Sequence, residues 1–199
     1  MKENLESIHI IRALTNPESV KAGTPIEDVE KDFQEWVMQN ATILLQKYKE
    51  RSPEKHWKKG EEKNMRLGMC GQLAFQHLLD YLHLSYNADD PSQPVKPYDF
   101  KLSIGTVEIK TYDHYCKYTI VKESEWKGND FVVVWKFTDE TQNHLALKGW
   151  LTKQEVESYP IIPKGECPQT PLASARVIPM ERLHDPKTFI EKLNIVRSP

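Results

Sequence analysis

The sequence of 199 residues has little cysteine, no long apolar run and almost no excess of charge of either sign. Its three cysteines are an odd number and form no CxxC pair, which argues against a disulfide scaffold or a structural zinc site. No apolar segment approaches the ~20 residues that span a bilayer, and the N-terminus lacks the apolar core of a signal peptide. We therefore expect a soluble cytoplasmic protein without a membrane partner, associated at most with the nucleoid.

The formal net charge of -2 excludes a protein that coats DNA through strong positive charge alone. The charge is nevertheless unevenly distributed, because residues 51–66 carry six basic and three acidic side chains and residues 67–100 carry one and four. Two interpretations stay open: a solvated surface of fluctuating charge, or basic walls around an acidic metal site. The second predicts phosphate contacts, and the candidates are Lys58, Lys59, Lys63, Arg66, Lys101 and Lys117.

Helical spacing of apolar residues dominates the first part of the chain. Thr24-Pro25 is a helix start signal, with an N-cap residue before a proline, and the periodic pattern that follows ends at Arg51-Ser52-Pro53. A second stripe predicts a helix over residues 61–84. Gly68 and Gly71 lie one turn apart in it, and we expect this helix to approach a sheet closely there.

After residue 97 the apolar period changes to two, which is typical of strands. Residues 98–102 and 106–111 predict a hairpin around a turn at Ile104-Gly105, and the apolar run of residues 131–137 predicts a strand buried on both faces. Further elements are expected at residues 143–151 (strand), 152–155 (start of a short helix), 176–180 (strand) and 186–193 (helix). This order indicates an α/β fold, with α+β as the other possibility.

The hairpin carries the residues with the clearest chemistry. Glu108 and Lys110 lie two apart on one strand and therefore point to the same face. With a two-residue turn at Ile104-Gly105, Asp99 would lie opposite Lys110 and Lys101 opposite Glu108. Two carboxylates would then share one polar face with two ammonium groups.

Two carboxylates suit Mg²⁺, which takes one or two protein carboxylates and keeps several waters. Such a metal orients and acidifies a water for attack on phosphorus, and a neighbouring lysine helps to activate that water or stabilises the developing charge. Asp99 and Glu108 are therefore the predicted metal ligands, with the carbonyl of Ile109 as a further ligand and Lys110 as the assisting cation. A plain exposed hairpin with a Glu–Lys pair is the structural alternative.

Aromatic and basic residues are interleaved just past these positions, at Tyr112, His114, Tyr115, Lys117 and Tyr118. They could stack on nucleic-acid bases, or they could simply pack along an edge strand. Glu123 and Glu125 are weaker candidates for an outer metal ligand, since a surface position explains them as well.

The pattern Asp99-(x8)-Glu108-Ile109-Lys110 resembles the motif of the PD-(D/E)XK nuclease superfamily, over roughly residues 61–160. The resemblance implies an α/β, restriction-endonuclease-like core with a central mixed β-sheet flanked by helices, and catalytic roles for Asp99, Glu108 and Lys110. Members usually carry a further acidic residue on the helix before the hairpin, where this chain has Gln72. Gln72 would orient a water or the substrate there, and it puts a second strong metal site in doubt.

These observations together predict an Mg²⁺-dependent endonuclease that hydrolyses DNA phosphodiester bonds, with Mn²⁺ as a substitute metal. The predicted organisation is an N-terminal helical appendage over residues 1–55 and a nuclease-like core over residues 56–199. Many members of the superfamily act as dimers, so the resemblance implies a possible homodimer. Three alternatives stay open: a noncatalytic nucleic-acid-binding protein on the same fold, an RNA-directed nuclease, and an interaction protein without a nucleic-acid role.

Overall fold

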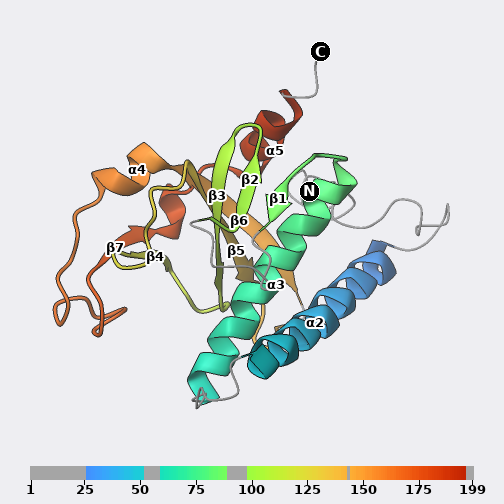
Figure 1. Ribbon diagram of the computed structural model, residues 1–199, viewed down its shortest axis with the longest axis horizontal. Helices are drawn as coiled ribbons and strands as arrows, with labels where there is room; N and C mark the ends of the chain where they lie inside the picture. The colour runs from blue at the N-terminus through green and yellow to red at the C-terminus, as the bar shows by residue number, and fades with distance from the viewer. Residues whose placement is uncertain (1–25, 52–58, 89–97, 143, 196–199) are drawn as a thin grey trace. The chain divides into compact units, whose positions relative to one another are not determined.

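The computed structural model describes residues 26–51, 59–88, 98–142 and 144–195 (Figure 1). The chain divides into two compact units, Met1–Ser85 with Phe137–Leu145, and Tyr86–Lys136 with Ala146–Pro199. This division differs from the predicted 1–55 and 56–199. Among the described residues, none of the helices combines the length and the apolarity needed to cross a bilayer.

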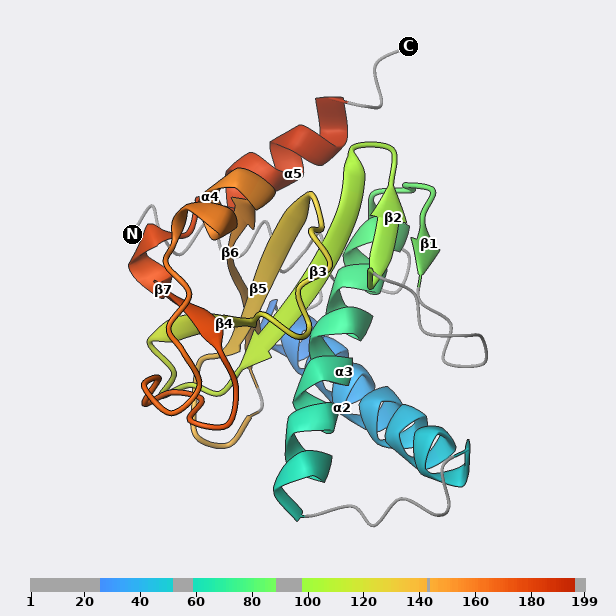
Figure 2. The ribbon, with the colours of Figure 1, turned by 60° about the vertical axis from the view of Figure 1, so that its left-hand side comes forward.

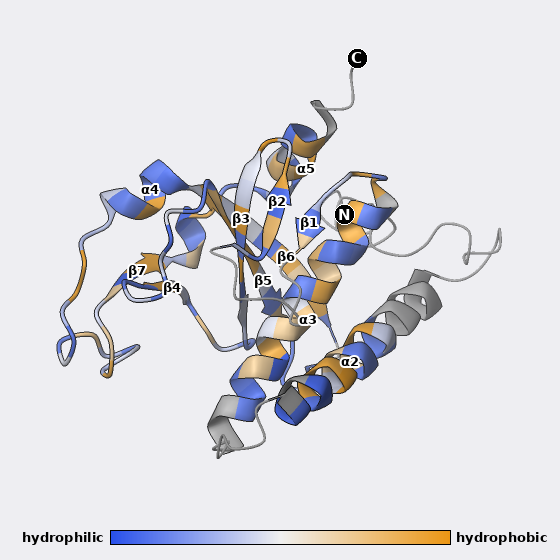
Figure 3. Cartoon of the chain, viewed as in Figure 1, coloured by the Kyte–Doolittle hydropathy of each residue, from blue (hydrophilic) through white to orange (hydrophobic). Residues whose placement is uncertain are grey.

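Two long helices form the first unit, α2 (Ile26–Arg51) and α3 (Lys59–Tyr81). Figure 3 shows apolar and hydrophilic residues along both, as amphipathic helices require. On α2 the buried Val37, Ala41 and Leu45 recur every four residues, which places them on one face. The helices pack on each other, and the Cys70 thiol of α3 lies 3.7 Å from the sulfur of Met38 on α2. Both predicted helices are thus confirmed, α3 beginning and ending a few residues earlier than expected.

A buried glutamine joins the segment Phe137–Leu145 to α2 within this unit. Gln34 is 5% exposed, and its amide makes two hydrogen bonds with the backbone of Leu145. The Leu145 N–H donates to Gln34 Oε1 at 3.0 Å, and Gln34 Nε2 donates to the Leu145 carbonyl at 3.3 Å. Because a buried amide without partners costs free energy, this pair of bonds fixes the segment against the helix.

The second unit is built on a mixed five-stranded sheet in the order β1-β2-β3-β5-β6 (Figure 2). β1 pairs antiparallel with β2 and β2 antiparallel with β3, whereas β3 pairs parallel with β5. The strands are β1 (Asn87–Ala88), β2 (Phe100–Leu102), β3 (Gly105–Tyr112), β5 (Phe131–Phe137) and β6 (Leu145–Thr152). The last residue of β5 and the first of β6 belong to the first unit. All residues of β5 except Lys136 are buried, as predicted for an interior strand.

An apolar cluster lies on one face of this sheet, and a second, two-stranded sheet contributes side chains to it. This second sheet was not predicted. That sheet consists of β4 (Tyr118–Lys122) and β7 (Ala175–Pro179), paired antiparallel. α4 (Lys153–Ser158) contributes as well, and a capping box of Thr152 and Glu155 begins this helix as expected. The cluster consists of Val121, Val132, Val134, Leu151, Val156, Ile178 and Met180.

The opposite face carries α5 (Pro186–Ile195). Phe189 of this helix lies 5.8 Å from the Phe131 ring and 5.5 Å from the Trp150 ring, measured between ring centroids. Successive strand residues point to opposite faces, so Phe131 and Trp150 lie on the other side of the sheet from Val132 and Leu151. The chain is therefore α/β, with a mixed central sheet and helices on both of its faces.

Candidate active site

The β2–β3 hairpin positions the candidate site. On β3, Val107 and Ile109 are buried and face one side, while Glu108 and Lys110 are partly exposed on the other. Lys101 of β2 is exposed between the buried Phe100 and Leu102. The predicted division of the hairpin into an apolar and a polar face is therefore confirmed.

The predicted register within the hairpin is wrong by two residues. Lys101 pairs with Thr106 rather than with Glu108, and Leu102 pairs with Gly105. The predicted pairing of Asp99 with Lys110 fails for the same reason. The turn consists of residues 103–104, and Gly105 already belongs to the strand, with a φ of 135°. A shift by an even number of residues keeps every side chain on its face, so the site residues stay together.

Gly105 is held in place by its neighbour Asp130. The Asp130 carboxylate accepts hydrogen bonds from the Thr106 N–H at 2.8 Å and from the Thr106 hydroxyl at 2.9 Å. These bonds lower the pKa of Asp130 below its usual value. A Cβ on Gly105 would lie 2.6 Å from an oxygen of the same carboxylate, so only glycine combines this φ with this contact.

We expect Gly105→Ala to lower the free energy of unfolding by about 1–3 kcal/mol, because alanine is strained at this φ and displaces Asp130. Gly68→Ala is the matched control, since no described atom outside its own stretch of helix lies within 4 Å of where its Cβ would be. Alanine at Gly68 should stabilise α3 by about 0.5–1 kcal/mol, because alanine has the higher helix propensity, and the close approach of Gly68 and Gly71 to a sheet stays a prediction. Chemical denaturation measures both, and equal shifts for the two variants would contradict this explanation.

Asp99 precedes β2 and is bound to the backbone of β3. Its N–H donates to the Val107 carbonyl at 3.1 Å, and its carboxylate Oδ2 accepts from the Ile109 N–H at 2.7 Å. In an extended strand the N–H and C=O of one residue point to the same side. The Ile109 carbonyl therefore lies on the side of β3 that carries Asp99, as a shared role in metal binding requires.

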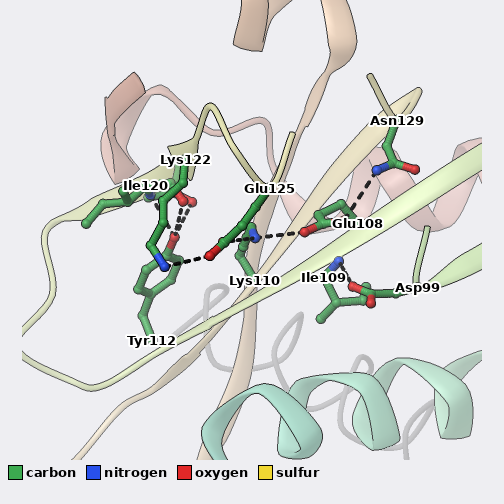
Figure 4. A network of polar contacts seen from close by, with 10 residues as sticks. Asp99, Glu108, Ile109, Lys110, Tyr112, Ile120, Lys122, Glu125 and Asn129 are labelled. Atoms are coloured by element: carbon green, nitrogen blue, oxygen red, sulfur yellow. Dashed lines mark hydrogen bonds and ion pairs between the residues drawn. The ribbon is translucent and has the colours of Figure 1, made fainter. Parts of the chain in front are cut away.

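Glu108 and Lys110 form the centre of a network of polar contacts (Figure 4). Lys110 Nζ lies 2.7 Å from Glu108 Oε1 and 3.8 Å from Glu125 Oε2. The side chains of Glu108 and Lys110 are 16% and 18% exposed, so the pair is largely shielded from water. Glu125 also pairs with Lys122 at 2.7 Å, and Asn129 Nδ2 donates to Glu108 Oε2 at 3.3 Å.

The charge state of Lys110 follows from this environment. Burial by itself would lower the pKa of Lys110, but the charge and the hydrogen bond of Glu108 outweigh it, with smaller contributions from Tyr112 and Glu125. The pKa of Lys110 is therefore raised above its usual value. At neutral pH the side chain is an ammonium ion, suited to stabilising negative charge rather than to accepting a proton.

The donor set suits a hard divalent cation. Asp99 and Glu108 offer carboxylate oxygens and Ile109 a carbonyl oxygen, the ligand types that Mg²⁺ prefers. Across the described residues, no group of three or more His, Cys, Asp and Glu side chains is placed to hold a metal ion. Mg²⁺ needs only one or two protein carboxylates, so two acids and a carbonyl fit it. Both oxygens of Glu108 have nitrogen donors nearby, so binding would exchange at least one of these contacts for the metal.

The other predicted site residues lie on several elements. Gln72 is half-buried on α3 of the first unit, and its role at the site stays a prediction. Arg66 of the same helix donates to Gln142 at 3.2 Å. Lys63, Lys101 and Lys117 are exposed, and their contact with phosphate stays a prediction. Lys58 lies outside the described residues, as does the side chain of Lys59.

Of the interleaved aromatics past the motif, Tyr112 serves packing. Its hydroxyl lies 2.9 Å from that of Thr119 and accepts the Ile120 N–H at 2.7 Å, which ties β3 to β4. Burial raises the pKa of Tyr112, so the phenol stays neutral. Tyr115 and Tyr118 are exposed, at 66% and 38%, so base stacking by these two stays a prediction.

Asn129 was missed by sequence reasoning, although it is 3% exposed and contacts Glu108. The available signal was an asparagine two residues before an apolar strand, where a buried polar residue needs a specific partner. Glu125 contacts Lys110 and is 49% exposed, which agrees with the predicted surface position, and its role as an outer metal ligand stays a prediction.

The comparisons with known proteins add no relationship. No protein-family model matches the chain, and neither curated proteins nor solved structures gave a match. Functional inference therefore depends on the geometry of the site.

Proposed function

We propose that this chain is an Mg²⁺-dependent endonuclease of restriction-endonuclease-like fold that hydrolyses phosphodiester bonds in DNA. One observation carries the proposal: the β2–β3 hairpin brings together Asp99, Glu108, Ile109 and Lys110. The Asp99 carboxylate accepts a hydrogen bond from the Ile109 N–H, and Lys110 forms an ion pair with Glu108. The types and spacing of these residues match the superfamily motif. The mixed sheet, with an antiparallel hairpin followed by a parallel strand, is compatible with such a core.

In this proposal Asp99 and Glu108 hold the cation, with the Ile109 carbonyl as a further ligand. The bound cation supplies acidification of a water and neutralisation of phosphate charge. Lys110, whose Nζ lies 2.7 Å from Glu108 Oε1, stabilises the negative charge that develops on phosphorus or assists the attacking water. Lys101 is exposed on the same face of the hairpin, where it would contact the phosphate backbone.

The test is nicking of supercoiled plasmid by the full chain with Mg²⁺ or Mn²⁺, compared with EDTA. Wild type should cut only with metal, and Glu108→Gln should lose at least ~10²-fold of the rate because a neutral amide binds a divalent cation poorly. Glu166→Gln is the matched control, since Glu166 is exposed in a loop, and it should cut as wild type does.

A parallel assay with single-stranded and duplex RNA separates the RNA-directed alternative. Metal-dependent cleavage of RNA but not of DNA would correct the substrate class. Salt-dependent binding of either nucleic acid without cleavage of any substrate would reject the enzyme and leave a noncatalytic binding protein. The homodimer implied by the resemblance stays a prediction.

A further inference from the structure

Asn129 is a buried amide that reaches the candidate metal ligand from outside the hairpin. It lies two residues before β5 and is 3% exposed. Its Nδ2 donates to Glu108 Oε2 at 3.3 Å, as Figure 4 shows. Burying a polar side chain costs free energy of desolvation unless the side chain is hydrogen-bonded. The bond to Glu108 offsets part of this cost for Asn129.

The backbone beside Asn129 is fixed. The Asp130 carbonyl accepts from the Lys153 N–H at 2.9 Å, and the Asp130 side chain is bound by Thr106. Asp130 is thereby tied to β3 on one side and to the start of α4 on the other. The Asn129 amide thus reaches Glu108 from a backbone position that is not free to shift.

Glu108 is therefore held by two donors of different kinds. Lys110, on the same strand, carries a positive charge and forms an ion pair with Oε1 of Glu108. Asn129 is neutral and donates a hydrogen bond to Oε2. A neutral donor fixes the orientation of a carboxylate without offsetting the charge that attracts a cation. An aspartate at this position could not donate in its ionised form and would repel Glu108.

We propose that Asn129 is a positioning residue of the metal site, which holds the carboxylate of Glu108 in the orientation that binds a divalent cation. The inference rests on the proposed function for the role of Asn129 in turnover, but its effect on metal affinity is measurable without turnover. Residues that hydrogen-bond a metal ligand typically contribute 10–100-fold to metal affinity or activity. Asn129 is such a residue, because its Nδ2 donates to Glu108 Oε2.

The experiment measures Mn²⁺ affinity of the metal-free full chain by electron paramagnetic resonance, without nucleic acid. Asn129→Ala should weaken Mn²⁺ binding ~10-fold or more and should raise the Mg²⁺ concentration needed for half-maximal cleavage. Asn129→Ser, which keeps a polar group and removes less volume, is a second variant in case the alanine variant fails to fold.

Gln34→Ala is the matched control for loss of a buried amide. It removes the two bonds to Leu145 in the first unit, so it should lower stability and leave Mn²⁺ affinity within ~2-fold. Weaker Mn²⁺ binding by the Asn129 variants alone supports the positioning role, even if no nucleic acid is cleaved and the proposed function fails. Cleavage by wild type together with unchanged Mn²⁺ affinity in both Asn129 variants overturns the positioning role and leaves the function standing.

Discussion

Replacing Lys110 by alanine is expected to reduce metal-dependent DNA cleavage by about 10²–10³-fold, the effect typical of removing one preorganised stabiliser of transition-state charge. The side chain of Lys110 is 18% exposed, and its Nζ lies 2.7 Å from Glu108 Oε1. Its raised pKa keeps it charged throughout the neutral range. Because the site is shielded from bulk water, water cannot fully replace this charge.

The measurement is the initial rate of plasmid nicking at saturating Mg²⁺, for the same substrate and ionic strength. Lys148→Ala is the control, because Lys148 is an exposed strand lysine on β6, and its rate should stay within ~2-fold of wild type. Circular dichroism establishes that both variants are folded. A Lys110→Ala variant that is folded and cleaves at the wild-type rate would remove Lys110 from the mechanism.

The second large effect concerns stability. Leu151→Ala should lower the free energy of unfolding by about 2–5 kcal/mol, the range for removing a buried leucine side chain. Leu151 is 2% exposed and belongs to the apolar cluster that includes β5 and the two-stranded β4–β7 sheet. The lost free energy combines transfer of apolar atoms to water with the cavity that stays behind.

Leu172→Ala makes the same chemical change at a residue that is 84% exposed. This variant should change the free energy of unfolding by no more than about 0.5 kcal/mol, because the substitution removes little buried apolar surface. Chemical denaturation followed by circular dichroism compares the two variants directly. Equal stability of the two would show that the cluster around Leu151 is not the core of this unit.

Much of the fold was predictable because its signals are local. The apolar run of residues 131–137 predicted β5, and the alternation on β3 predicted which side chains share the face of Glu108. A shift of two residues in strand pairing leaves every side chain on the same face of the sheet. The predicted face of each side chain was therefore correct, although the predicted register was wrong. The register itself depended on Gly105, whose φ reflects contact with Asp130, 25 residues further on.

The small sheet and the contact of Asn129 could not be predicted for a different reason. A strand was predicted at residues 176–180, where β7 lies, but β4 was not predicted. The two strands pair across more than fifty residues, beyond the reach of a local pattern. Asn129 looks like a loop residue in sequence, and only the fold brings it to Glu108. Contacts between distant segments are set by packing rather than by local preference.

The central claim is that Asp99 and Glu108 hold a divalent cation together. Its most direct test is to locate Mn²⁺ by anomalous diffraction in crystals of the full chain soaked with the metal. We expect a peak coordinated by both carboxylates, with oxygen ligands at about 2.1–2.2 Å. Absence of any peak there at saturating Mn²⁺, or a site that includes only one of the two residues, would contradict the claim.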